Sequence, residues 1–150
     1  MLGGSGYSDF IRALFIGSII PAISEETLFR GFLQSSLEQD YKPYKAILIT
    51  ALIFSILHLN PIGFIPLICI GLFLGFVAYS TNNIILPMII HFINNTIAII
   101  IIFSPELTAA ENQISKVPLF TAILLLNVGL LVLLVSCIII FTESKFKKIT

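Results

Sequence analysis

The stretch PAISEETLFRGFL, residues 21–33, places Glu25, Glu26 and Arg30 close together in surroundings that are otherwise mostly apolar. The residues just before it, 11–23, are mostly apolar as well. Charged groups in such a setting either mark a helix end that reaches water or form a working site, because an ionised side chain is costly in hydrocarbon. The fold therefore depends on whether a helix starts here or passes through.

The composition is that of an integral membrane protein. Of the 150 residues, 57% are hydrophobic and 11% are charged, and the mean hydropathy is +1.06. Soluble domains carry about twice that share of charged residues. The net charge is zero, so nothing in the composition favours nucleic acid as a partner. The two cysteines, Cys69 and Cys137, lie in apolar runs and predict buried free thiols rather than a disulfide framework.

The apolar segments predict an all-α fold, a polytopic transmembrane helical bundle of about five spans. A spanning helix needs about 20 mostly apolar residues. Four segments approach or exceed that length: 44–59, 62–80, 84–103 and 118–142. The segment 62–80 contains Gly71 and Gly75, a GxxxG spacing that lets helix backbones approach closely.

The segment before these four is harder to interpret. Residues 10–37 extend to about 42 Å as a helix, and Pro21 is expected to kink or break it. We predict one long element that crosses the membrane once, which brings the number of spans to five.

The ionisable groups inside the predicted spans are few. They are Glu25, Glu26, Arg30, His58 and His91, with Asn94 and Asn95 as uncharged polar neighbours. Glu26 and Arg30 are four residues apart, so on a helix they share a face and can pair. Glu25 lies about 100° around the helix from Glu26, which leaves it the freer carboxylate and the better candidate for a general base.

Each of these residues also has a simpler interpretation. Ser24 is a possible N-cap of a helix whose first turn carries both glutamates, which would suit the helix dipole. His58 is a possible interfacial histidine near a helix C-terminus. His91 and Asn95 are a possible interhelical hydrogen-bonding pair, with Asn94 as a competitor.

Taken together, the set predicts one polar pocket formed by three spans. A base, a histidine partner and two oxyanion donors suffice for hydrolysis of an amide by water, and such donors act most strongly in a dry site. No serine, cysteine or threonine stands in a recognisable nucleophile motif, so direct attack by water is the simpler mechanism.

Three motifs in order carry a family resemblance: EETLFR matches EExxxR, FSILH matches FxxxH and HFINN matches HxxxN. The sequence resembles the CPBP family of CAAX proteases and bacteriocin-processing enzymes, also called Abi proteins. The resemblance implies an intramembrane endopeptidase in which Glu25 is the general base and His58 helps it to activate water. It further implies that Glu26 and Arg30 support that base and that His91 and Asn95 form the oxyanion hole. Phe54 matches a motif position with a packing role.

The family has often been called metalloprotease, so zinc held by Glu25, His58 and His91 is the alternative to a mechanism without a cofactor. No HExxH motif is present, and we expect no metal. The expected partners are a peptide or protein substrate at or in the membrane and the lipid bilayer. The alternatives to a protease are a non-proteolytic membrane scaffold or bacteriocin self-immunity protein, and a proton or cation pathway.

The predicted organisation follows from these assignments. It comprises a flexible lead (1–9), a catalytic membrane core (10–103), an extramembrane loop (104–117), an additional transmembrane helix (118–142) and a basic tail (143–150). Lysines 42, 45, 145, 147 and 148 fall on one side of the membrane, and Arg12 and Lys116 on the other. The positive-inside rule makes the first side, with the C-terminus, cytoplasmic. The isoleucine, lysine and asparagine bias favours a bacterial cell membrane.

Overall fold

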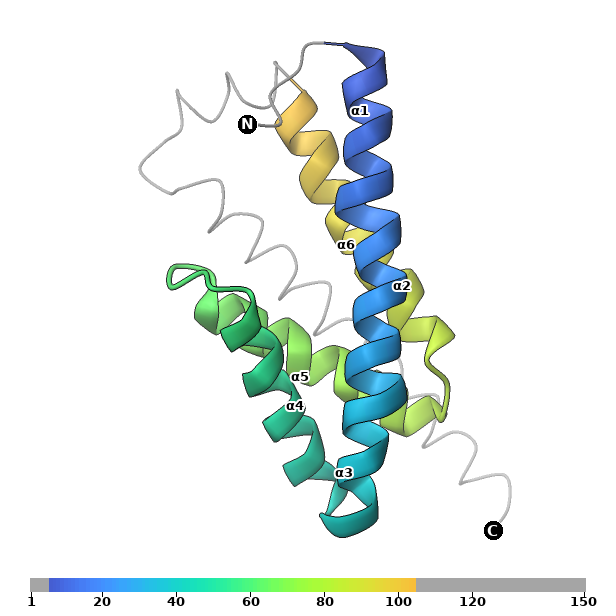
Figure 1. Ribbon diagram of the computed structural model, residues 1–150, viewed down its shortest axis with the longest axis vertical. Coiled ribbons are helices and arrows are strands. Elements are labelled where there is room, and N and C mark those ends of the chain that lie inside the picture. Colours follow the sequence, from blue (N-terminus) through green and yellow to red (C-terminus); the bar gives the residue numbers. More distant parts are fainter. Residues whose placement is uncertain (1–5, 105–150) are drawn as a thin grey trace, which may run out of the picture. The chain divides into compact units, whose positions relative to one another are not determined.

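The computed structural model describes residues 6–104, and all regular elements in that range are helices (Figure 1). In chain order they are α1 (Tyr7–Leu14), the π-helical η1 (Phe15–Ile19), α2 (Ile20–Glu26), the π-helical η2 (Thr27–Gln34), α3 (Ser35–Asp40), α4 (Pro43–Leu57), α5 (Phe64–Thr81) and α6 (Ile85–Phe103). The all-α prediction is therefore confirmed for the described residues.

The first five elements form one continuous helix, Tyr7–Asp40, of 34 residues. The prediction of a single long element is confirmed, and Pro21 does not break it (Figure 1). The π-turn η1 ends at Ile19, two residues before Pro21. Its wider backbone gives room to the proline ring, which would clash with the preceding turn of a regular α-helix.

The interpretation of Ser24 as an N-cap is wrong. Ser24 lies in the interior of the long helix, where its Oγ donates a hydrogen bond to the carbonyl of Ile20 at 2.7 Å. The glutamates that follow it therefore do not sit in a first helical turn, and the helix dipole does not explain why they are there.

Three of the described helices are long and apolar enough to cross a membrane: Tyr7–Asp40, Phe64–Thr81 and Ile85–Phe103. The fourth apolar helix, Pro43–Leu57, has 15 residues, or about 22 Å, and is shorter than the predicted span 44–59. The predicted loop 104–117, helix 118–142, tail 143–150 and Cys137 lie outside the described residues. The count of five spans and the cytoplasmic C-terminus remain predictions.

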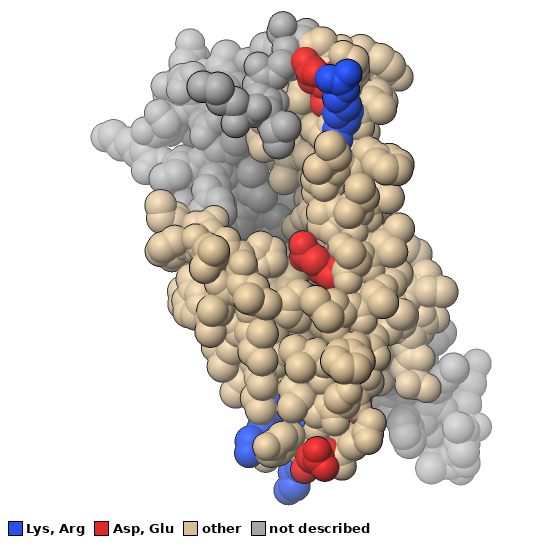
Figure 2. All heavy atoms as spheres, in the orientation of Figure 1, with Lys and Arg blue, Asp and Glu red and all other residues tan. Residues whose placement is uncertain are grey.

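Large apolar side chains are exposed along the described helices, as expected where lipid replaces water. On the face shown in Figure 2, basic and acidic side chains gather toward the two ends, and one acidic group lies near the middle. Cys69 is a free thiol, as expected, and is half-buried.

Helices α4 and α5 pack against each other and against η2, whereas α6 packs against α1, η1 and α2 (Figure 1). Gly71 explains the close approach of α4 and α5, because a Cβ there would lie 3.1 Å from the Cα of Ala51. A Cβ on Gly75 would lie 2.8 Å from Oε1 of Gln34. The tight packing expected of the GxxxG spacing is confirmed. On the other side, Ser18 Oγ donates to the carbonyl of Phe92 at 2.9 Å.

We expect Gly71→Val to destabilise the fold by about 1–3 kcal/mol, because the added atoms must push the α4 backbone away. The measurement is the free energy of unfolding in detergent micelles. Gly31→Ala is the matched control, since the nearest atom to its Cβ is 3.7 Å away. Equal stability of the two variants would contradict the close approach of α4 and α5.

Candidate active site

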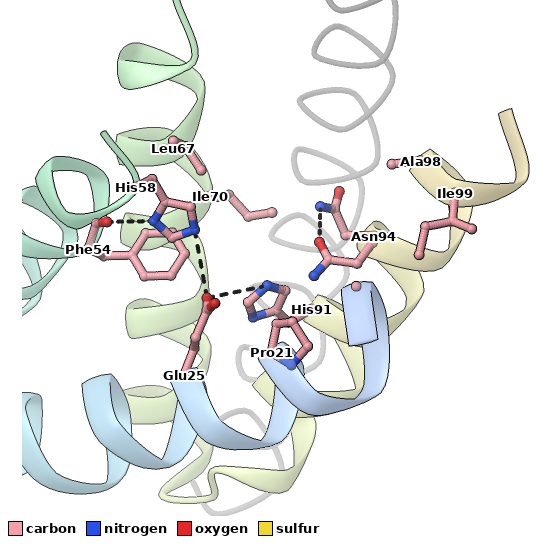
Figure 3. Close-up of a pocket in the computed structure, with 12 residues that line it drawn as sticks. Pro21, Glu25, Phe54, His58, Leu67, Ile70, His91, Asn94, Ala98 and Ile99 are labelled. Atoms are coloured by element: carbon pink, nitrogen blue, oxygen red, sulfur yellow. Dashed lines mark hydrogen bonds and ion pairs between the residues drawn. The ribbon is translucent and has the colours of Figure 1, made fainter. Parts of the chain in front are cut away.

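The polar residues singled out by the sequence come together from three separate helical segments (Figure 3). Glu25 lies on the long helix, His58 at the C-terminal end of α4, and His91 and Asn95 on α6. All four line a cavity of about 340 Å³, which we call the first cavity. Its remaining walls are mostly apolar and come from Gly17, Pro21, Phe54, Leu67, Ile70, Asn94, Ala98 and Ile99.

Glu25 faces both histidines across this cavity. Its Oε2 lies 3.8 Å from Nε2 of His58 and 3.9 Å from Nε2 of His91. Both distances exceed a direct hydrogen bond, and Oε2 has no hydrogen-bond partner among the described residues. The carboxylate is therefore held within ion-pair distance of two ring nitrogens without a direct hydrogen bond to either.

The backbone determines the tautomer of His58. Its Nδ1 lies 2.7 Å from the carbonyl oxygen of Phe54. A carbonyl only accepts hydrogen bonds, so Nδ1 carries the proton and the neutral ring presents an unprotonated Nε2 to Glu25. The interpretation of His58 as a histidine at a helix C-terminus is correct, and the same position places it in the first cavity.

Glu26 and Arg30 form a fully buried ion pair behind the first cavity. Arg30 Nη1 donates to Glu26 Oε1 at 2.9 Å, and both side chains have no exposed area. The second amino group, Nη2, donates to the carbonyl of Gly71 at 3.0 Å. The prediction that Arg30 serves Glu26 rather than Glu25 is confirmed.

The same carboxylate orients His91, which is almost fully buried. His91 Nδ1 donates to Glu26 Oε1 at 2.8 Å, which turns Nε2 toward Glu25. Such a carboxylate partner determines both the tautomer and the direction of an imidazole ring.

Phe54 lies between the charged groups and the first cavity. Its ring centroid is 4.4 Å from that of His58, and the guanidinium carbon of Arg30 stands 5.0 Å from the ring centroid. The rings of Phe54 and Phe29 are nearly perpendicular, with their centroids 5.1 Å apart. The packing role expected for Phe54 fits these contacts.

Asn94 and Asn95 both line the first cavity, so the sequence correctly left them as competitors. Asn94 Nδ2 donates to Asn95 Oδ1 at 3.4 Å (Figure 3). This contact occupies the oxygen of Asn95 and leaves its amide hydrogens free to donate into the cavity.

Gln34 was not among the polar residues predicted to lie inside the bundle, yet it is as deeply buried as Arg30. Its Nε2 donates to the carbonyl of Gly75 at 3.0 Å and to Glu38 Oε1 at 2.9 Å. The signal was present as a series at four-residue spacing, since Glu26, Arg30, Gln34 and Glu38 share one face of the helix.

A zinc ion at this site would take Glu25, His58 and His91 as its ligands. Among residues 6–104, no group of three or more His, Cys, Asp or Glu side chains is placed to hold a metal ion. Tetrahedral zinc with ligand bonds of about 2.0–2.2 Å would need its ligand atoms closer together than the 3.8 and 3.9 Å found between Glu25 and the two histidines.

Comparison with known proteins gives one family. The family model described as type II CAAX prenyl endopeptidase Rce1-like matches residues 7–97. This range begins with the long helix and includes every residue of the candidate site. No curated protein and no solved structure matches the chain.

Removing one partner of the buried ion pair should be costly. We expect Arg30→Met to lower the free energy of unfolding by about 3–5 kcal/mol, because Glu26 would remain buried and uncompensated. The double variant Glu26→Gln with Arg30→Met should lose less than the sum of the two single variants. Unfolding of all four proteins in mixed micelles measures this coupling, and strictly additive losses would contradict it.

Proposed function

The chain belongs to the Rce1-like family of type II CAAX prenyl endopeptidases, and on this premise we propose that it is an intramembrane endopeptidase that activates a water molecule with Glu25 and His58. The observation that carries the proposal is the pair of unpaired acceptors facing each other across the first cavity. Glu25 Oε2 and His58 Nε2 are 3.8 Å apart. When the carboxylate is ionised and the imidazole is neutral with its proton on Nδ1, both atoms are acceptors and neither can donate to the other.

A water molecule satisfies both acceptors. It donates one hydrogen to Glu25 and the other to His58, which leaves its oxygen lone pairs directed into the cavity. A carboxylate and an imidazole within hydrogen-bond reach of the same water are the arrangement that general-base catalysis requires. As the water oxygen attacks the peptide carbonyl carbon, Glu25 takes its proton.

The negative charge that develops on the carbonyl oxygen needs donors. We assign them to His91 Nε2 and to the amide of Asn95. Since Nδ1 of His91 already donates to Glu26, Nε2 donates only when the ring is an imidazolium, and Glu25 and Glu26 supply the two carboxylates that balance its charge. Donors in a site shielded from water stabilise such an oxyanion more strongly than they would in solution.

The second half of the reaction returns the proton. The carbon–nitrogen bond breaks as the proton held by Glu25 passes to the leaving amine, so one water is consumed and a carboxyl and an amino terminus are formed. Glu26 and Arg30 do not touch the reacting atoms in this scheme. They act by holding His91 in the orientation that its role requires.

The substrate that we propose is a peptide or protein segment presented at the membrane. The apolar side of the first cavity, with Leu67, Ile70 and Ile99, accepts apolar groups next to the scissile bond. The name of the matching family makes a prenylated CAAX peptide the first substrate to assay.

Loss of the base should abolish cleavage. We expect Glu25→Gln and His91→Ala each to lower kcat about 100-fold or more, and Glu25→Gln to leave detergent unfolding little changed, because Glu25 Oε2 has no hydrogen-bond partner among the described residues. The assay uses internally quenched peptides in proteoliposomes, one of them ending in a farnesylated CAAX sequence. Ser24→Ala is the matched control, because its exposed hydroxyl contacts only the helix backbone one turn away.

The same experiment separates the alternatives. A protein whose biological effect survives both Glu25→Gln and His91→Ala would be a scaffold or self-immunity protein and not a protease. Proton flux into liposomes that disappears in Glu25→Gln, with no peptide cleaved by the wild type, would instead indicate a proton pathway.

We further propose that the reaction needs no metal cofactor, which the separation of the three candidate ligands supports. Dialysis against a zinc chelator should leave the cleavage rate unchanged, and added Zn²⁺ should not raise it. A loss of activity that stoichiometric Zn²⁺ restores would overturn this proposal and assign zinc to Glu25, His58 and His91.

A further inference from the structure

The position of the first cavity raises the question of how water reaches it. Glu25 lies about 22 Å from the Asp40 end of the long helix and about 27 Å from the Tyr7 end. The hydrocarbon core of a bilayer is about 30 Å thick, so a helix of this length places Glu25 far from both aqueous phases. Hydrolysis consumes one water molecule at this depth in every turnover.

A second cavity lies on the other side of Arg30. It has a volume of about 580 Å³, and most of its lining residues are of polar type, from the second half of the long helix, the C-terminal end of α5 and the turn that follows α5. Arg30 is its deepest point on the long helix, about 15 Å from Asp40. Glu38, Asn82 and Asn83 line it near the helix ends. The second cavity thus leads from an end of the described helices to the buried ion pair.

Two buried side chains in the lining of the second cavity carry unpartnered polar atoms. Arg30 and Gln34 are each 2% exposed, and neither Arg30 Nε nor Gln34 Oε1 has a hydrogen-bond partner among the described residues. One atom is a donor and the other an acceptor, so both polar capacities face the lining of the second cavity without a protein partner. Gly75 makes room for the Gln34 amide, since a Cβ there would lie 2.8 Å from Gln34 Oε1.

A series of three hydrogen-bonded side chains connects the two cavities. Arg30 lines the second cavity and donates to Glu26, and Glu26 accepts from His91, which lines the first cavity. The hydrogen-bonded series from Glu38 through Gln34 ends at the same guanidinium, with the gap described above as its single interruption.

We propose that the second cavity is a water-filled inlet that supplies the hydrolytic site from the Asp40 end of the long helix. The supply role rests on the proposed function, because only hydrolysis consumes water. The hydration of the second cavity does not rest on it and is tested separately.

Accessibility of an introduced thiol measures the hydration. In a background carrying Cys69→Ala and Cys137→Ala, we compare Gly31→Cys with Phe32→Cys in proteoliposomes. Gly31 lines the second cavity and has room for a Cβ, its nearest neighbour being Ile84 Cδ1 at 3.7 Å. Phe32 is one residue nearer the helix end, is 66% exposed and lines neither cavity.

The probe is a charged, membrane-impermeant methanethiosulfonate. Only a thiolate reacts with it, and a thiolate forms in water but not in lipid, so Gly31→Cys should react more than about tenfold faster than Phe32→Cys. Equally slow reaction of both thiols would overturn the water-filled inlet.

The supply role is tested on the same two proteins. Labelling Gly31→Cys fills the second cavity and should lower kcat with KM unchanged, and a reducing agent that removes the label should restore it. Phe32→Cys, labelled with an uncharged reagent, should keep its kcat. Full activity of labelled Gly31→Cys, or an equal loss in both, would overturn the supply role. If the unlabelled protein cleaves no peptide, the proposed function fails, while the ratio of labelling rates still decides whether the second cavity holds water.

Discussion

Two opposite charges, Glu26 and Arg30, are buried without exposed area among mostly apolar helices. Leaving either charge unpaired at such a depth would cost several kcal/mol, so the surrounding structure has to supply hydrogen bonds. It does so from two directions, through His91 on α6 and through the carbonyl of Gly71 on α5. The ion pair therefore links the long helix to both neighbours.

The two glycines of α5 serve different neighbours. A Cβ on Gly75 would lie 2.8 Å from Gln34 Oε1 and stand in the way of the Gln34 amide, whereas a Cβ on Gly71 would meet α4 at Ala51. Arg30 and Gln34 reach the carbonyls of these two glycines one helical turn apart. In hydrocarbon, where no water competes for such donors, hydrogen bonds of this kind give the helix pair its register.

Adjacent glutamates take different roles because a helix turns about 100° per residue. Glu26 points into the bundle, where its Oε1 accepts from both Arg30 and His91. Glu25 points into the first cavity, where its side chain is 28% exposed and its Oε2 unpaired. Glu26, whose Oε1 is held by two donors, orients a histidine, and Glu25, which no donor holds at Oε2, keeps the access that a general base needs. The π-turn η1 keeps this arrangement within one continuous helix despite Pro21, because its wider backbone accommodates the proline ring without a break.

The sequence by itself determined the helical class, the presence of one long first element, the pairing of Glu26 with Arg30 and the membership of His58, His91 and Asn95 in one polar set. These conclusions rest on spacing within a helix and on the cost of charge in apolar surroundings, which are local properties. Only the tertiary structure decided that Ser24 is not a cap, that α4 is shorter than a typical span, and that Gln34 is as buried as Arg30. It also decided the direction of His91, because the Glu26 carboxylate that orients this ring lies 65 residues away in the chain. The tautomer of His58 follows from the ring conformation, which places Nδ1 against the carbonyl of Phe54 one helical turn earlier. Spacing along a helix tells which side chains share a face, whereas the partner of that face is chosen by how the helices pack.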